Sequence, residues 1–147
     1  MKRNFSIFTG LMMALTLGLA LFVTPSFTTP TAAQVAPPAS AEEAKRELAR
    51  LASTNLSRIK DAKVRNAAQR VVAALQAVAN NRDARKEAAL IQTFETSLAN
   101  VNTEASQSAE YQTKAFKCND DRQKCKAACP KTFCGCGVSF LTCLVVG

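Results

Sequence analysis

Six cysteines lie in the last 30 residues of the 147-residue chain, and no other residue type is so well placed to do chemistry. They are Cys118, Cys125, Cys129, Cys134, Cys136 and Cys143. Four thiolates could hold a metal ion in a tetrahedral site, two could exchange electrons, and all six could form structural cross-links. The stretch "CKAACPKTFCGCG" at 125–137 holds four of them, in a spacing that is not a recognised zinc ribbon or knuckle.

The N-terminal sequence favours the third of these uses, in which the cysteines form structural cross-links. Lys2 and Arg3 precede an apolar run at 11–23, and small residues follow that run. This order is typical of a secretory signal peptide, here 1–33 with cleavage after Ala33. An uncleaved membrane anchor is the alternative. Because exported proteins meet an oxidising compartment, we expect a secreted or periplasmic protein with three disulfides.

The composition excludes several classes of chemistry. The chain has no histidine, which removes Ser-His-Asp and Cys-His catalysis and mixed Cys/His zinc sites. It has no tryptophan and one tyrosine, Tyr111, so aromatic stacking on bases or sugars is poorly supported. We therefore expect no catalytic residue, no cofactor, no metal ligand and no sequence-specific recognition of nucleic acid.

The charge suggests a class of partner. The whole chain carries a formal charge of +8, and without Lys2 and Arg3 the remaining 17 basic and 11 acidic residues give +6. A moderate basic excess suits a protein partner or an anionic surface, and it is also common on soluble proteins with no dedicated ligand.

The elements that carry the cysteines are predicted to be mainly helical. A short proline-containing linker at 34–39 leads to a helix that begins with a capping box, Ser40 and Glu43. A second helix is expected at 84–101, with Asp83 as its N-cap. The polar segment "STN" at 53–55 can break the first helix, so 40–101 is predicted as an antiparallel hairpin or as three helices.

Two apolar stripes at helical spacing are expected to bury each other. The first contains Leu48, Ala52, Leu56, Ile59, Ala62, Ala67, Val71, Ala74, Leu75 and Val78. The second contains Ala84, Ala88, Ile91, Phe94, Leu98 and Val101.

A small cysteine-rich module is expected at 114–147, after a polar segment at 102–113 that is either a linker or a solvated helix. The module should contain a short helix, capped at 119–121 and ended by Pro130, that places Cys125 and Cys129 on one side. The run "VSFLTCLVV" at 138–146 is rich in β-branched and aromatic residues and favours a strand.

Geometry restricts the pairing of the cysteines. Residues four apart on a helix have Cβ atoms ~5–6 Å apart, too far for a disulfide, so each pair must reach across the chain reversal at 129–134. The natural nested order is Cys129 with Cys134, Cys125 with Cys136 and Cys118 with Cys143. The outermost bridge fits only if the last segment is helical, against its propensity, and six cysteines allow 15 connectivities, so the order stays open.

A C-x-x-x-C at 125–129 that faces a C-x-C at 134–136 resembles the cysteine-stabilised α/β motif of defensins and related toxins. The resemblance covers 118–143 and implies a helix cross-linked to strands. The chain departs from that motif because only four residues separate Cys129 from Cys134, and because Cys143 follows the C-x-C.

Three functions are consistent with this sequence. The first is a non-enzymatic secreted or periplasmic protein in which a helical domain and a disulfide-stapled module act in binding or structure. The second is a precursor that releases a cationic antimicrobial or toxin-like peptide. The third is a thiol–disulfide exchange protein that uses Cys134-Gly135-Cys136, with Lys126 or Lys131 lowering a thiol pKa.

Overall fold

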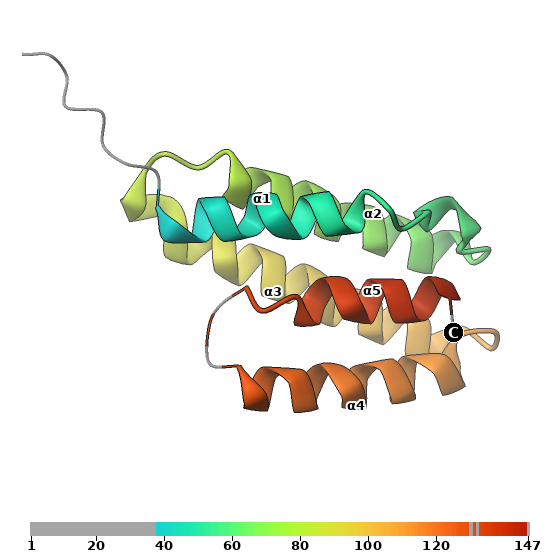
Figure 1. Ribbon diagram of the computed structural model, residues 1–147. Coiled ribbons are helices and arrows are strands. Elements are labelled where there is room, and N and C mark those ends of the chain that lie inside the picture. The colour runs from blue at the N-terminus through green and yellow to red at the C-terminus, as the bar shows by residue number, and fades with distance from the viewer. Residues whose placement is uncertain (1–37, 130, 132, 147) are drawn as a thin grey trace, which may run out of the picture. The chain divides into compact units, whose positions relative to one another are not determined.

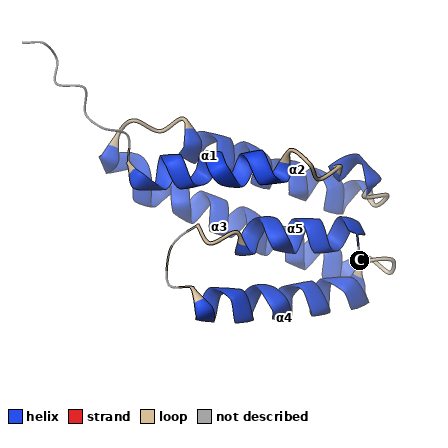
Figure 2. Ribbon diagram, viewed as in Figure 1, coloured by secondary structure: helices blue, strands red, loops and turns tan. Residues whose placement is uncertain are grey.

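The computed structural model describes residues 38–129, 131 and 133–146, and these form five α-helices, one 3₁₀ turn and no strand (Figures 1 and 2). The helices are α1 (Ala39–Leu51), α2 (Ala62–Ala79), α3 (Ala84–Gln107), α4 (Gln112–Ala128) and α5 (Cys136–Val146), and the turn η1 (Leu56–Arg58) precedes α2. The expected signal segment at 1–33 lies outside the described residues. Within the described residues, no helix has both the length and the apolarity needed to cross a bilayer.

The first helix begins two residues earlier than the capping box predicted, so that prediction was wrong. Pro38 is the N-cap of α1, with extended backbone angles, and its carbonyl accepts a hydrogen bond from the Ala41 N–H at 2.9 Å. Ser40 therefore lies inside the helix, where its hydroxyl is buried without a partner. Alanines on both sides of Ser40 are strong helix formers, which extends the helix back to the proline.

The break predicted at 53–55 is present, so the region 40–101 contains three helices. Asn55 caps η1 by accepting a hydrogen bond from the Ser57 N–H, and Asp61 caps α2 by accepting from Lys63 and Val64. Asp83 caps α3, as predicted, by accepting from the Arg85 N–H at 3.0 Å. Short polar side chains at each boundary satisfy helix N–H groups that have no partner within the helix.

The two apolar stripes bury each other through their central parts. The pair α2 and α3 packs face to face, with Val71, Leu75 and Val78 on one side and Phe94 and Leu98 on the other, all buried. The small residues at the stripe ends behave differently: Ala52, Ala62, Ala84 and Ala88 are exposed. Alanine offers little apolar area to bury, so an alanine at helical spacing does not have to lie in the core.

The polar segment after Val101 is helical as far as Gln107, because α3 continues two turns past the predicted end. Ala105 is buried on its inner face and the surrounding residues are largely exposed. Tyr111 then closes the turn into α4: its ring is buried and its hydroxyl accepts a hydrogen bond from the Lys60 N–H at 3.1 Å. A buried tyrosine hydroxyl needs such a partner.

The predicted strand at 138–146 is helix α5, and this is the main correction to the predicted fold. The helix is apolar almost all round, and its Phe140, Leu141 and Leu144 are each at most 1% exposed. A short apolar run does not distinguish a buried helix from a buried strand, so packing and cross-links decided between them.

The C-terminal helices share one core with the first three. Side chains from α1, α2, α3, α4 and α5 all belong to a single buried cluster. Its largest fully buried members include Phe140, Ile59, Leu75, Leu98, Leu141 and Leu144. The pair α4 and α5 packs side by side, α4 also packs on α3, and α5 also contacts α1.

Gly137 is where α5 comes closest to α3. A Cβ added at this glycine would lie 2.8 Å from Leu98 Cδ1 and 3.0 Å from Phe94 Cζ, closer than ordinary van der Waals contact.

We predict that Gly137→Ala lowers the free energy of unfolding by about 1–3 kcal/mol, because the neighbours must move to admit one methyl group. Urea unfolding measures this. Ser139→Ala, at an exposed position of the same helix, is the control and should change stability by less than about 0.5 kcal/mol. Equal losses in both variants would contradict the packing argument.

Candidate functional site

The cysteines form a ladder of three disulfides between α4 and the segment that contains α5. The bridges are Cys118–Cys143, Cys125–Cys136 and Cys129–Cys134, with Cα–Cα distances of 5.8, 5.7 and 6.2 Å. This is the nested order that the spacing favoured. We call these three bridges the disulfide ladder.

The ladder explains why the last segment is helical. Cys118 and Cys125 are seven residues apart on α4, which corresponds to about 10.5 Å of helix. A strand from Cys136 to Cys143 would cover about 23 Å and could not meet both partners. A helix covers the same 10.5 Å, so the two bridges close only when both segments are helical.

The chain turns between the helices at residues whose backbone suits a reversal. Cys129 is the C-cap of α4 with extended angles, as expected for a residue that precedes proline. Gly135 has a φ of +79°, a conformation that favours glycine, and its carbonyl accepts the first hydrogen bond of α5, from the Ser139 N–H at 2.8 Å. The predicted cap at 119–121 was wrong, because α4 is continuous from Gln112.

In this structure the cysteines serve as cross-links. Every cysteine is in a disulfide, so none presents a thiolate to a metal ion. Cys134 and Cys136 have separate partners, so they do not form the mutual bridge of a C-x-C redox pair. The C-x-C here leads into a helix, so the strands implied by the defensin-like motif are absent from the described residues.

The three bridges constrain the unfolded chain to different degrees. Their sequence separations are 25, 11 and 5. In the chain-entropy account, these rings contribute about 3.5, about 2.7 and about 2 kcal/mol of stability. Cys118–Cys143 is therefore expected to stabilise the fold most, and Cys129–Cys134 least.

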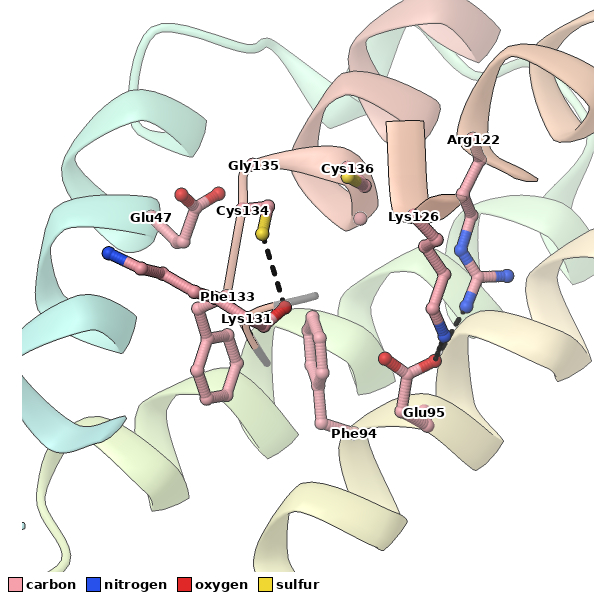
Figure 3. A pocket seen from close by; sticks show the side chains of 11 residues that line it. Glu47, Phe94, Glu95, Arg122, Lys126, Lys131, Phe133, Cys134, Gly135 and Cys136 are labelled. Carbon is pink, nitrogen blue, oxygen red and sulfur yellow. Dashed lines mark hydrogen bonds and ion pairs between the residues drawn. The ribbon is translucent and has the colours of Figure 1, made fainter. Parts of the chain in front are cut away.

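A small hollow lies beside the ladder, between α1, α3, α4 and the residues 131 and 133–137 (Figure 3). Its volume is about 20 Å³, room for about one water molecule. Phe94 and Phe133 form its apolar side, with ring centroids 5.3 Å apart. Its polar side chains are Glu47, Glu95, Arg122, Lys126 and Lys131.

Glu95 joins α3 to α4 at the rim of this hollow. Its Oε2 accepts hydrogen bonds from Arg122 Nη2 at 2.7 Å and from Lys126 Nζ at 3.0 Å (Figure 3). The Arg122 side chain is only 7% exposed, and its guanidinium lies 5.9 Å from the ring centroid of Phe140. A buried guanidinium needs a counter-ion, so this carboxylate fixes the position of α4 on α3.

Glu47 comes from α1 on the opposite side of the hollow. Its side chain is 6% exposed, and its Oε1 accepts a hydrogen bond from Arg50 Nη1 at 3.0 Å. The pair sits directly on Gly135, where an added Cβ would lie 2.9 Å from Arg50 Nη1 and 3.5 Å from Glu47 Oε1. Burial raises the pKa of Glu47, and the nearby Arg50 and Arg46 charges only partly oppose that rise.

The sequence pointed to the cysteines, Lys126 and Lys131 but not to Glu47, Glu95 or Arg122. Glu47 lies three residues after Ala44 and four before Leu51, so it shares their buried helical face. Arg122 lies between Cys118 and Cys125 at the same spacing. A charge that interrupts an otherwise apolar or cysteine-lined helix face is the signal that could have found both.

An open groove lies on the other side of α1, where α1, η1 and α2 meet. Its volume is about 580 Å³, within the range of small-molecule sites. Leu48, Leu51, Leu56 and Val72 provide most of its apolar lining. Leu48 and Leu56 belong to the predicted stripe, and they are only partly buried because they line this groove.

Comparison of the chain with protein-family models, with curated proteins and with solved structures gives no match. The function is therefore inferred from the geometry of the ladder and its surroundings.

We predict that Glu95→Gln lowers the free energy of unfolding by about 1–3 kcal/mol, because it leaves the Arg122 guanidinium buried without a counter-ion. Asp120→Asn is the control: it removes the exposed Asp120–Lys124 pair, which water screens, so the stability should stay close to that of the wild type. Chemical denaturation of both variants under oxidising conditions makes the comparison. A Glu95→Gln protein as stable as the control would show that Arg122 does not depend on this carboxylate.

The raised pKa of Glu47 makes a prediction about pH. Below its usual pKa of about 4.5 the group is protonated in both the folded and the unfolded chain, so it does not favour either state. As the pH rises, the unfolded chain releases this proton first, and the folded state loses stability up to the raised pKa. Glu47→Gln should therefore be more stable than the wild type at pH 7, and the difference should vanish below about pH 4. Thermal melts across this range test it, and a variant that is less stable at pH 7 would contradict it.

Proposed function

We propose that this chain is a non-enzymatic secreted or periplasmic protein in which a helical domain and a disulfide-stapled helix pair act in binding or structure. The observation that carries the proposal is the disulfide ladder, which commits every cysteine to a cross-link between α4 and α5. Three disulfides also indicate an oxidising, extracytoplasmic environment. The signal peptide at 1–33, cleaved after Ala33, belongs to this proposal.

The surface supports binding over a purely structural role. The groove between α1 and α2 leaves leucine side chains partly open to solvent. Phe116 on α4 is 81% exposed, which is unusual for a phenylalanine. A partner protein that covers apolar surface, or an anionic surface that meets the basic excess, would suit these features.

The peptide-precursor alternative is less well supported by the packing. Gly137 of α5 fits against Phe94 and Leu98 of α3, and Arg122 of α4 is paired with Glu95. Release of α4 and α5 would expose both the apolar contact and the buried arginine. The cysteine-rich part is thus better suited to remain attached than to leave as a peptide.

Secretion of the full-length chain from an oxidising compartment tests the proposal. Intact mass measured without reduction should give one species that begins near Gln34 and lacks two hydrogens for each of three disulfides. A C-terminal product of ~3–4 kDa, a mass set by the length of 114–147, would instead support the precursor. Catalytic turnover in an insulin-reduction assay would contradict the non-enzymatic assignment.

A further inference from the structure

The three disulfides of the ladder differ in how accessible they are. Cys118 is 2% exposed and Cys136 is 6% exposed, so Cys118–Cys143 and Cys125–Cys136 each have one cysteine inside the core. In Cys129–Cys134 both residues are only half-buried. A thiol in solution therefore has its best access at Cys129–Cys134.

Cys129–Cys134 is also the bridge that the fold needs least. It closes the shortest ring, with a sequence separation of 5, and the two remaining bridges still hold α4 against α5 at two points. Its opening would leave α4 and α5 joined.

The two sulfurs of this bridge lie at helix ends of opposite polarity. Cys129 is the C-cap of α4, where the partial negative charge of the helix disfavours a thiolate. Cys134 immediately precedes Gly135, whose carbonyl accepts the first hydrogen bond of α5, so it lies at the positive end of that helix. The helix ends therefore favour Cys134 as the leaving group, because the thiol with the lower pKa leaves faster. The carbonyl oxygens of Lys131 and Cys129, 3.1 and 3.4 Å from Cys134 Sγ, act in the opposite direction.

We propose that Cys129–Cys134 is a site of thiol–disulfide exchange, at which an external thiolate attacks Cys129 and expels Cys134. The attacking sulfur forms a bond to Cys129 Sγ as the Cys129–Cys134 bond breaks, and the electron pair of that bond leaves on Cys134 Sγ as a thiolate. A monothiol stops at the mixed disulfide on Cys129. A dithiol continues: its second thiolate displaces Cys129 as a thiolate, so the dithiol is oxidised to a disulfide and the protein pair is reduced by two electrons.

The hollow beside the bridge sets its reactivity. Glu47 lies over Gly135, next to the leaving sulfur, and Lys126 and Lys131 line the same hollow (Figure 3). An ionised carboxylate disfavours the Cys134 thiolate, whereas the two ammonium groups favour it. Glu47→Gln should therefore raise the rate of exchange at this bridge by about two- to threefold.

The sequence allows a direct test by peptide mapping. Trypsin cleaves after Lys117, Arg122, Lys124, Lys126 and Lys131, so Cys118, Cys125 and Cys129 fall in three separate peptides. Each of these peptides reports on one bridge. Cys134, Cys136 and Cys143 stay together in the peptide 132–147.

The experiment treats the folded, oxidised full chain with limiting glutathione, stops the reaction with acid, alkylates the thiols and digests with trypsin. We expect glutathione on peptide 127–131, which contains Cys129, and the alkyl group on Cys134 in peptide 132–147. Glutathione mainly on Cys134, or first modification of the peptide that contains Cys118, would overturn the proposal.

A double variant provides the matched control. Cys129→Ser with Cys134→Ser should keep the circular dichroism spectrum of the wild type and should lose glutathione uptake at least tenfold. If this variant takes up glutathione at the wild-type rate, or if Glu47→Gln slows exchange in the wild-type background, the proposed site is wrong. Stoichiometric exchange is compatible with the non-enzymatic function, so failure here leaves the secretion experiment to decide that function separately.

Discussion

The register of the disulfide ladder is the constraint on which the rest of this structure depends. Two bridges start seven residues apart on α4 and end seven residues apart on α5, and this equality holds only for two segments with the same rise per residue. Once α4 is a helix, α5 must be one. The cross-links thus override a strand propensity that amounts to no more than ~1 kcal/mol per position. They also place Gly137 against α3 and Gly135 beneath the Glu47–Arg50 pair of α1.

Two glycines let the ladder dock on the helical domain. Gly135 supplies a positive φ at the start of α5, and Gly137 supplies the close approach to Phe94 and Leu98. The pattern "CGCG" therefore alternates residues that tie α5 to α4 with residues that let the chain approach α1 and α3. This alternation joins the cysteine-rich part and the helical part in a single core.

Charged side chains are buried where the cysteine-rich part packs on the helical part, and their burial costs free energy. Glu95 neutralises the buried Arg122, which favours one position of α4 on α3. Glu47 is less well compensated, as its raised pKa indicates, and it lies beside the half-buried Cys129–Cys134 bridge. A buried carboxylate with a raised pKa and the half-buried disulfide thus meet at one hollow. The packing of the cysteine-rich part on the helical part therefore also sets the surroundings of the bridge at which we propose thiol–disulfide exchange.

The sequence by itself determined the helical class, the break at 53–55, the cap at Asp83, the central parts of both apolar stripes and the use of the cysteines as cross-links. These features follow from local rules: capping chemistry, the 3.6-residue period and the spacing of cysteines. The capping box at Ser40 failed because Pro38 and its neighbouring alanines offered an earlier start. Only the tertiary structure decided that 138–146 is a helix and that Glu47 and Arg122 are buried. In each case the deciding interaction joins residues far apart in the chain, and local propensity does not contain that information.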